Sequence, residues 1–310
     1  MNSSPMRVLV AVDGSEPAGL AVDLVANAAW PPGSEIIVAE AVETGAGVYG
    51  GPWPAFAVVD TDRIEADFRA AAQETVLEAC EKLARPGLNV EEVVLRGRPA
   101  TAIVDQAHRM HADLVVVGSR GHGTIDSMLL GSVSAEVVDH APAPVLVARG
   151  SAMARIVLGW DGSSCAACAA DLLRRWPIFE GCQVRIVSVA HVGIPWWTGF
   201  PEAGSPEMMP MYLEAKDGSR KQRDELAQEM TAELQSSGFT AEADRREGDP
   251  ATEILSAATT SRADLIVVGT RGRTGLKRLV LGSVARNVLL HATCSVLVVR
   301  DGPPEDAADR

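Results

Sequence analysis

The sequence predicts an α/β protein of two tandem domains, each an open parallel five-stranded sheet of order 3-2-1-4-5 with helices on both faces. Short apolar runs rich in β-branched residues alternate with longer helical patterns, which is typical of a parallel sheet with crossover helices. The same order of elements occurs in both halves of the 310 residues. A glycine frame also occurs twice, as GSRGHGTIDSMLLGS at 118–132 and GTRGRTGLKRLVLGS at 269–283. Two copies in one frame indicate a duplicated domain.

The first half begins with an apolar strand at 7–12, and Ser15 is a candidate N-cap for the helix that runs to about Trp30. Pro31 and Gly33 end that helix. The remaining predicted elements are a strand at 35–42, an irregular segment at 43–59, a helix at 60–85, a polar strand at 90–96, a helix at 99–110, a strand at 113–117, a helix after Gly131 and a strand at 144–149.

The second half repeats this order. The segments 154–164, 248–258 and 295–300 match 6–16, 97–107 and 144–149. Its irregular segment is predicted at 191–211, before a helix that carries Leu226, Met230 and Leu234 on one face. The sequence thus predicts domains at 1–150 and 151–310, with a seam near 150–153 and a disordered acidic tail at 301–310.

The predicted sheet order places a crevice between strands 1 and 4, where ligands of open α/β sheets bind. Asp13 follows strand 1 and Gly118 ends strand 4, so the spacing puts a carboxylate opposite the glycine loop. The apolar last strands, 144–149 and 295–300, would each leave an open edge. We expect them to pair with each other, which makes the chain an intrachain pseudo-dimer.

The glycine frame suits a phosphate-bearing ligand. A Cβ at Gly121 would keep a ligand away from the backbone, and the helix that opens after Gly131 and Ser132 has N–H groups free to bind an anion. The alternative interpretation is that these glycines only make tight turns. The duplication favours the ligand site.

Composition excludes several classes of function. The formal charge of −13 argues against non-specific nucleic-acid binding, no apolar run reaches membrane-spanning length, and no signal peptide precedes the first strand. We therefore expect a cytoplasmic protein with no membrane partner, and five cysteines kept reduced. A local basic cluster is the exception, and it either meets phosphates or is a solvated helix face: Arg271, Arg273, Lys277 and Arg278.

These features resemble the universal stress protein family in its tandem form, and the glycine frame resembles that of its ATP-binding subgroup. The resemblance implies that Asp13 and the backbone of Ala41 hold the adenosine end of ATP. Gly118 would lie by the ribose, and the phosphate contacts would be Gly121, Gly131, Ser132, Val133 and Ser134. The matching positions of the second half are Asp161, Val189, Gly269, Gly272, Gly282, Ser283, Val284 and Ala285.

The second site departs from the first at two positions. Ala285 lacks the hydroxyl of Ser134, and Trp160 replaces Val12, where its indole could stack on a base or fill the pocket. Neither half has a GxxxxGK[ST] loop or a pair of acids placed as a base, so binding of ATP, with Mg²⁺, is favoured over turnover.

Three functions stay open. The first is a nucleotide-dependent regulator in stress or slow growth, the second a slow ATPase or nucleotidyl-transfer enzyme, and the third a structural pseudo-dimer with empty pockets. Whether two chains form a homodimer is also open.

Other motifs carry less weight. The GxGxxG at 45–50 follows strand 2 and precedes Pro52, so it does not fit a dinucleotide fingerprint. Cys165 and Cys168 are expected to be helix-packing residues, and His108 and His111 could share a helix face as metal ligands but lack a third ligand. His140 and His291, each at a helix end, are interpreted as structural. Aromatic residues in 43–59 and 191–211 either form a lid or partner surface or pack on their own domain.

Overall fold

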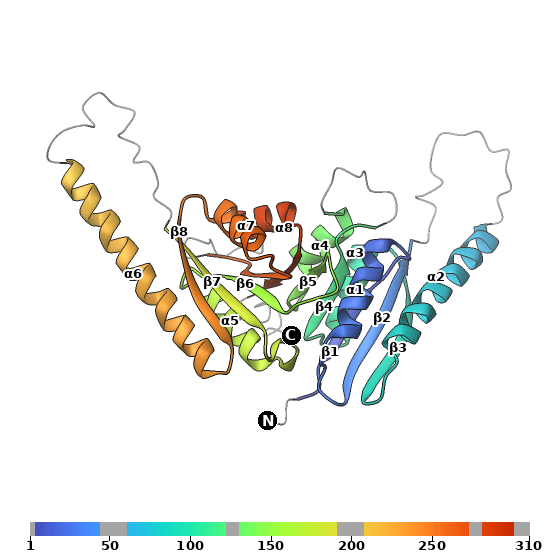
Figure 1. The fold of residues 1–310 in the computed structure, drawn as a ribbon. Coiled ribbons are helices and arrows are strands. Elements are labelled where there is room, and N and C mark those ends of the chain that lie inside the picture. The colour runs from blue at the N-terminus through green and yellow to red at the C-terminus, as the bar shows by residue number, and fades with distance from the viewer. Residues whose placement is uncertain (1–3, 44–60, 122–129, 191–207, 273–280, 301–310) are drawn as a thin grey trace, which may run out of the picture. The chain divides into compact units, whose positions relative to one another are not determined.

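The computed structural model describes residues 4–43, 61–121, 130–190, 208–272 and 281–300 (Figure 1). The chain divides into two compact units. Unit 1 contains Met1–Ala152 together with Thr293–Val298 and Gly302–Arg310, and unit 2 contains Met153–Ala292 and Val299–Asp301. The irregular segment predicted at 43–59 lies outside the described residues except for Glu43, and the one predicted at 191–211 lies outside them up to residue 207. The tail at 301–310 also lies outside them.

Unit 1 has the predicted sheet order, β3-β2-β1-β4-β5, with parallel pairing throughout these five strands. Its elements are β1 (Arg7–Ala11), α1 (Glu16–Asn27), β2 (Ser34–Val42), α2 (Thr61–Leu83), β3 (Leu88–Arg96), α3 (Pro99–Arg109), β4 (Leu114–Gly118), α4 (Ser132–His140) and β5 (Val145–Ala148).

Burial explains why the central strands are continuously apolar. Val8, Leu9 and Val10 of β1 are fully buried, and so are Leu114, Val115 and Val116 of β4. The edge strand β3 is largely exposed, as its polar sequence LNVEEVVLR predicts. The core of the unit therefore sits on both faces of β1 and β4.

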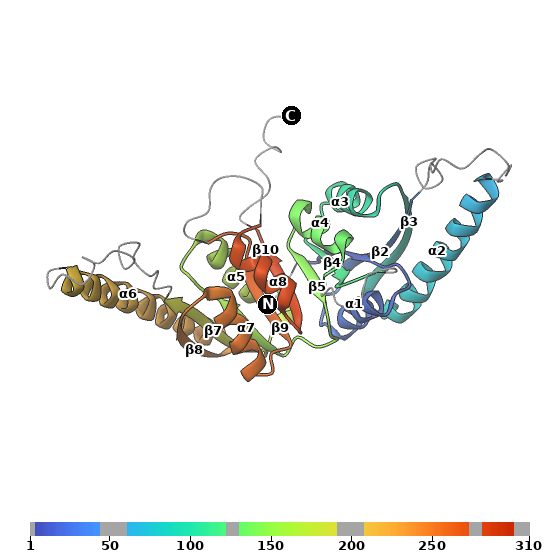
Figure 2. The same cartoon turned by 90° about the horizontal axis from the view of Figure 1, so that it is seen from above.

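Two pairs of helices cover the sheet of unit 1. α1 contacts α2, α3 contacts α4, and the two pairs lie on opposite sides of the sheet (Figure 2). The side chain of Ser15 caps α1 by accepting from the Ala18 N–H, as predicted. α1 ends at Asn27 rather than at Trp30, whose buried indole donates to the Val25 carbonyl at 2.7 Å.

Unit 2 repeats the order as β10-β9-β6-β7-β8. Its elements are β6 (Arg155–Gly159), α5 (Ser164–Arg175), η1 (Pro177–Phe179), β7 (Gln183–Ala190), α6 (Met208–Ser236), β8 (Thr240–Glu247), α7 (Pro250–Thr260), β9 (Leu265–Gly269), α8 (Ser283–His291) and β10 (Ser295–Val299). The 3₁₀ turn η1 was not predicted. α6 also begins inside the segment predicted as irregular to 211. Pro210 lies in its first turn, where a helix tolerates proline.

The two last strands pair, as the open-edge argument predicted. β10 runs antiparallel to β5, with Val296 opposite Val147 and Leu297 opposite Leu146. The Arg149 N–H donates to the Ser295 hydroxyl at 3.1 Å beyond the ladder. Residues 293–298 accordingly cluster with unit 1.

Within the described residues, no helix has the length and apolarity needed to cross a membrane.

Candidate nucleotide site

The reversal of strand order lies where the sequence placed it in both units. β1 pairs with β4 through Ala11 and Val117, so Asp13 and Gly118 end neighbouring parallel strands. β6 pairs with β9 in the same way. These are the switch points of the two sheets, and they bring together chain segments more than a hundred residues apart.

Asp13 is fixed between the start of α1 and the loop after β4. One carboxylate oxygen accepts from the Ser15 N–H at 3.1 Å and from the Ser15 hydroxyl at 2.6 Å. The other oxygen lies directly against the backbone of Gly121, where any Cβ would collide with it. Asp161 repeats this geometry, accepting from the Ser163 N–H at 2.9 Å and lying 2.7 Å from the position of a Cβ on Gly272.

The first glycine of each frame is required by packing against the chain itself. A Cβ on Gly118 would stand 2.7 Å from the Pro17 carbonyl carbon and 2.8 Å from the Ala18 nitrogen. A Cβ on Gly269 would stand 2.6 Å from the Cβ of Cys165. Neither glycine has a positive φ. Space rather than backbone conformation therefore selects glycine here, and the tight-turn interpretation does not explain it.

The third glycine closes the loop. The Gly131 N–H donates to the Ser119 carbonyl at 2.7 Å, and the Gly282 N–H donates to the Thr270 carbonyl at 2.8 Å. A Cβ on Gly131 would lie 3.3 Å from the Arg120 Cα. The loop thus returns to its own starting point, and the next helix begins beside Gly121. Residues 122–129 and 273–280 between these ends lie outside the described part, with Arg273, Lys277 and Arg278.

The helices that follow begin without a side-chain cap. Gly131 caps α4 and Gly282 caps α8, and neither helix has a side-chain hydrogen bond at its N-cap. Ser15 and Ser163, by contrast, cap α1 and α5. The first-turn N–H groups of α4 and α8, at Ser132, Val133 and Ser134 and at Ser283, Val284 and Ala285, have no intrahelical acceptor. They are suited to an anion.

The side chain of Ser134 has a partner of its own. It is buried, and its hydroxyl donates to the Gly118 carbonyl at 2.7 Å, which ties α4 to the end of β4. Ala285 cannot make this bond to Gly269. The hydroxyl is therefore engaged within the fold. The backbone N–H of Ser134, in the first turn of α4, is the group left for the predicted phosphate contact.

Two guanidinium groups add positive charge to unit 1. Arg149 follows β5 and Arg120 follows β4, at the same edge of the sheet. Burial, with a smaller contribution from the charge of Arg120, lowers the pKa of Arg149 to about 10, and the effect of Cys294 opposes this decrease. Arg149 remains a cation at neutral pH, and its charge and that of Arg120 would favour a polyphosphate.

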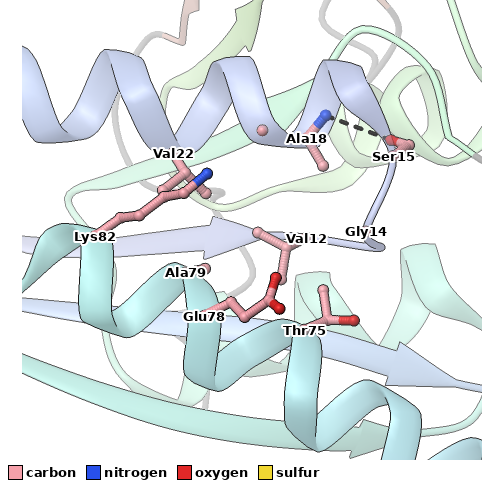
Figure 3. A pocket seen from close by; sticks show the side chains of 10 residues that line it. Val12, Gly14, Ser15, Ala18, Val22, Thr75, Glu78, Ala79 and Lys82 are labelled. Carbon is pink, nitrogen blue, oxygen red and sulfur yellow. Dashed lines mark hydrogen bonds between the residues drawn. The ribbon is translucent and has the colours of Figure 1, made fainter.

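A pocket of about 110 Å³ opens beside Asp13 in unit 1, between α1 and α2 (Figure 3). Its walls include Val12 and Gly14 after β1, Ala18 of α1, and Thr75 and Ala79 of α2. The pocket does not reach Ala41, Gly118 or Gly131. Its link to the predicted site is through Val12 and Gly14, which flank Asp13 in the chain.

The equivalent region of unit 2 is filled by α6. The buried Trp160 indole donates to the Leu226 carbonyl at 3.1 Å, and a Leu226 methyl lies 3.0 Å from the position of a Cβ on Gly162. A guanidinium N–H of Arg223 donates to the Val189 carbonyl. Of the two alternatives for Trp160, the structure therefore shows the one in which the indole fills the pocket.

Two further motifs have structural roles. Cys165 is buried against Gly269, with its sulfur 3.7 Å from the Thr270 hydroxyl, and all five cysteines are free thiols. His111 lies beyond the end of α3 with a φ of 51°. His108 and His111 therefore do not share a helix face, although the sequence allowed it. Among the described residues, no group of three or more His, Cys, Asp or Glu could hold a metal ion.

At the other end of the central strands, an aspartate makes contacts that were not predicted. It accepts a backbone hydrogen bond in both units and also forms an ion pair in unit 2. Asp264 accepts from the Arg155 N–H at 2.9 Å and pairs with its guanidinium at 2.7 Å, while Asp113 accepts from the Arg7 N–H at 2.8 Å. The hydrogen bond from Arg155 is the main cause that lowers the pKa of Asp264. Asp113 and Asp264 stand at matching positions directly before β4 and β9, and this repetition was a visible signal for the role.

Comparison with known proteins identifies the fold family. The family model for the universal stress protein family matches residues 5–149 and again 153–300. A universal stress protein of Mycolicibacterium smegmatis is 30% identical over 222 residues, which cover 69% of this chain and 70% of that protein. One from Thermus aquaticus is 36% identical over 143 residues, which cover 46% of this chain and 97% of that protein.

Solved structures agree on the fold. The crystal structure of a universal stress protein from Archaeoglobus fulgidus DSM 4304 has a TM-score of 0.66 at 19% identity, and the match covers 96% of this chain and 98% of that one. A functionally unknown Pseudomonas aeruginosa protein has a TM-score of 0.59 at 18% identity, over 98% of this chain and 95% of that one. With the duplicated sheet and the two family matches, this chain belongs to the universal stress protein family.

Proposed function

We propose that this stress-related protein binds ATP, with Mg²⁺, in the crevice of unit 1 and acts as a nucleotide-dependent regulator in stress or slow growth. The observation that carries the proposal is the meeting of Asp13, the backbone of Gly121 and the start of α4. Two segments more than a hundred residues apart there offer a carboxylate and a run of backbone N–H groups to one ligand.

The residues present fit such a ligand. Asp13 and the Ala41 backbone would hold the adenosine end. The N–H groups at the start of α4, from Ser132 to Ser134, would receive the phosphates, because the end of a helix dipole and unpaired N–H groups favour an anion. Mg²⁺ is commonly bound through the phosphates of its ligand, so the site needs no metal cage of its own.

Binding rather than turnover is the function that this chemistry supports. Asp13 is held by Ser15 and by the backbone of Gly121, where it can orient a nucleoside. Neither half of the sequence has the GxxxxGK[ST] loop that places a lysine on a transferring phosphate. A ligand at a thousand times its Kd stabilises the form that binds it by about 4 kcal/mol. That is enough to reverse a modest conformational equilibrium.

Calorimetric titration of the stripped full chain with Mg-ATP tests the proposal. We expect binding below 1 mM, and a loss of at least about tenfold in affinity for Asp13→Asn, since a hydrogen bond to a charged group is worth about 1.5–3 kcal/mol. Asp105→Asn is the control, because Asp105 is an exposed carboxylate on α3, away from the crevice.

The outcomes are distinct. No heat up to millimolar Mg-ATP would refute ATP binding. Equal affinity of Asp13→Asn and the native chain, with circular dichroism unchanged, would refute the role of Asp13. Release of inorganic phosphate above a blank, abolished by Asp13→Asn, would replace the regulator with the slow ATPase.

A further inference from the structure

We propose that the chain holds one nucleotide rather than two, because side chains of α6 occupy the nucleoside end of the crevice in unit 2. The inference rests on the proposed function, since the ligand is the same ATP. It assigns to α6 the role of an internal occupant of unit 2, whereas a pocket stays open beside Gly14 in unit 1.

The two units can be compared residue by residue, because their ladders are in the same register. Arg7 pairs with Glu35 where Arg155 pairs with Gln183. Glu35 then pairs with Asn89, and Gln183 with Thr240. The glycines two residues before these last positions, Gly87 and Gly238, both have positive φ, at 89° and 93°.

This register aligns α2 with α6. Counting back from the two glycines, the buried Leu83 of α2 corresponds to the buried Leu234 of α6. The pocket walls of unit 1 then acquire larger counterparts in unit 2. Thr75 corresponds to Leu226 and Ala79 to Met230, while Val12 corresponds to Trp160 on the strand side. Ala72, which does not line the pocket, corresponds to Arg223.

Leu226 and Met230 stand where unit 1 has the smaller pocket-lining residues Thr75 and Ala79. Leu226 lies against Gly162, the counterpart of the pocket residue Gly14. Met230 is 5% exposed and Trp160 is 8% exposed, so both are part of the core. The Trp160 indole is also held in place by its hydrogen bond to the Leu226 carbonyl.

Arg223 blocks the hydrogen-bonding position as well as the space. Its guanidinium donates to the carbonyl of Val189, the backbone position that corresponds to Ala41. The exocyclic amino group of an adenine is the same kind of donor, so the arginine would compete with it for one acceptor. Ala72, the counterpart in unit 1, has no polar group and cannot compete.

The phosphate side of unit 2 does not compensate for this closure. Gly272, Gly282 and the uncapped start of α8 match their counterparts in unit 1. A nucleoside excluded from its end of the crevice would leave only phosphate contacts, and part of the binding free energy would be lost. The two halves therefore share a phosphate loop and differ in access for the nucleoside.

Stoichiometry and location of binding test the inference on the full chain. Calorimetric titration with Mg-ATP is expected to give one site per chain. Hydrogen exchange is expected to show protection by Mg-ATP in 114–121 and 130–140, and no protection in 265–272 and 281–291. Two sites per chain, or protection of both pairs of segments, would overturn the inference and leave the proposed function standing.

Residue exchange between the units provides matched variants. The opening variant carries Trp160→Val, Arg223→Ala, Leu226→Thr and Met230→Ala, which are the residues of unit 1, and is expected to bind two nucleotides. The closing variant carries Thr75→Leu and Ala79→Met and is expected to bind none. A folded opening variant that still binds one nucleotide would refute the role of α6.

Two controls separate failure of the inference from other failures. Circular dichroism and thermal melting establish that each variant is folded, and if the fourfold variant is not, the exchange pattern of the native chain decides alone. No binding by the native chain at any site would refute the proposed function, and with it the inference.

Discussion

Replacing Gly118 by alanine should destabilise unit 1 through a backbone collision rather than through any change in the ligand site. The added Cβ would lie 2.7 Å from the Pro17 carbonyl carbon and 2.8 Å from both the Ala18 nitrogen and the Pro17 oxygen. These atoms belong to the first turn of α1, which is fixed by its Ser15 cap and by packing on β4 and β5. The neighbours can therefore yield only if the helix shifts.

The cost follows from the behaviour of overpacked cores. Forced shifts of backbone in a well-packed core cost about 1–3 kcal/mol. With a urea m-value of about 2 kcal/mol per molar, a loss of about 2 kcal/mol lowers the unfolding midpoint by about 1 M. Because the chain has two units, hydrogen exchange of amides in β1 and β4 should be followed beside circular dichroism, so that the loss is assigned to unit 1.

Gly19→Ala is the matched control. Gly19 directly follows Ala18 in α1, and outside the helix's own backbone no heavy atom lies within 4 Å of the position of its Cβ. Alanine is favoured over glycine in a helix interior by about 0.5–1 kcal/mol, so this variant should be more stable than the native chain. A Gly118→Ala protein as stable as the native chain, with an unchanged m-value, would refute the packing argument.

Three other predictions concern single interactions. Ser134→Ala should cost about 1 kcal/mol by removing the buried bond to the Gly118 carbonyl, measured by urea unfolding; no change would show that the bond contributes nothing. Asp264→Asn should be less stable than the native chain at pH 7. The Arg155 hydrogen bond lowers the pKa of Asp264 in the folded state, so this difference in stability should be constant above about pH 5 and shrink as the pH falls through and below about 4. A difference that grows on acidification would contradict the prediction. Burial, with a smaller effect of Glu92, raises the pKa of the Cys80 thiol to about 11, so at pH 8 it should be alkylated on the order of a hundredfold more slowly than a free thiol, as followed by mass spectrometry; alkylation as fast as in urea would contradict this.

The architecture could be predicted because the signals were local and repeated. Apolar β-branched runs identified β1 and β4, and the polar sequence of β3 placed it at an edge. The open-edge argument then predicted that β5 and β10 pair, and the ladder confirms it. Spacing along the chain was also enough to bring Asp13 to the loop after Gly118.

Sequence alone did not reveal what the glycines and α6 do. The space around Gly118 and Gly121 is taken by Pro17, Ala18 and Asp13, and such contacts between distant segments leave no periodic signal. Trp160 was visible as a departure from the repeat. Its partners on α6 were not, because the chain between β7 and β8 is three residues longer than that between β2 and β3 (Gln183 to Thr240 against Glu35 to Asn89), and spacing alone does not show where the extra residues lie.

The pairing of β10 with β5 also bears on how the protein is made. Residues 293–298 complete the sheet of unit 1, although the bonded residues Arg149 and Ser295 are 146 positions apart. The first unit therefore leaves the ribosome long before β10, the strand that pairs with β5, has been translated. Until then β5 presents an apolar border without a partner, which would attract chaperones or another nascent chain. A fragment that stops at the seam would keep that border permanently.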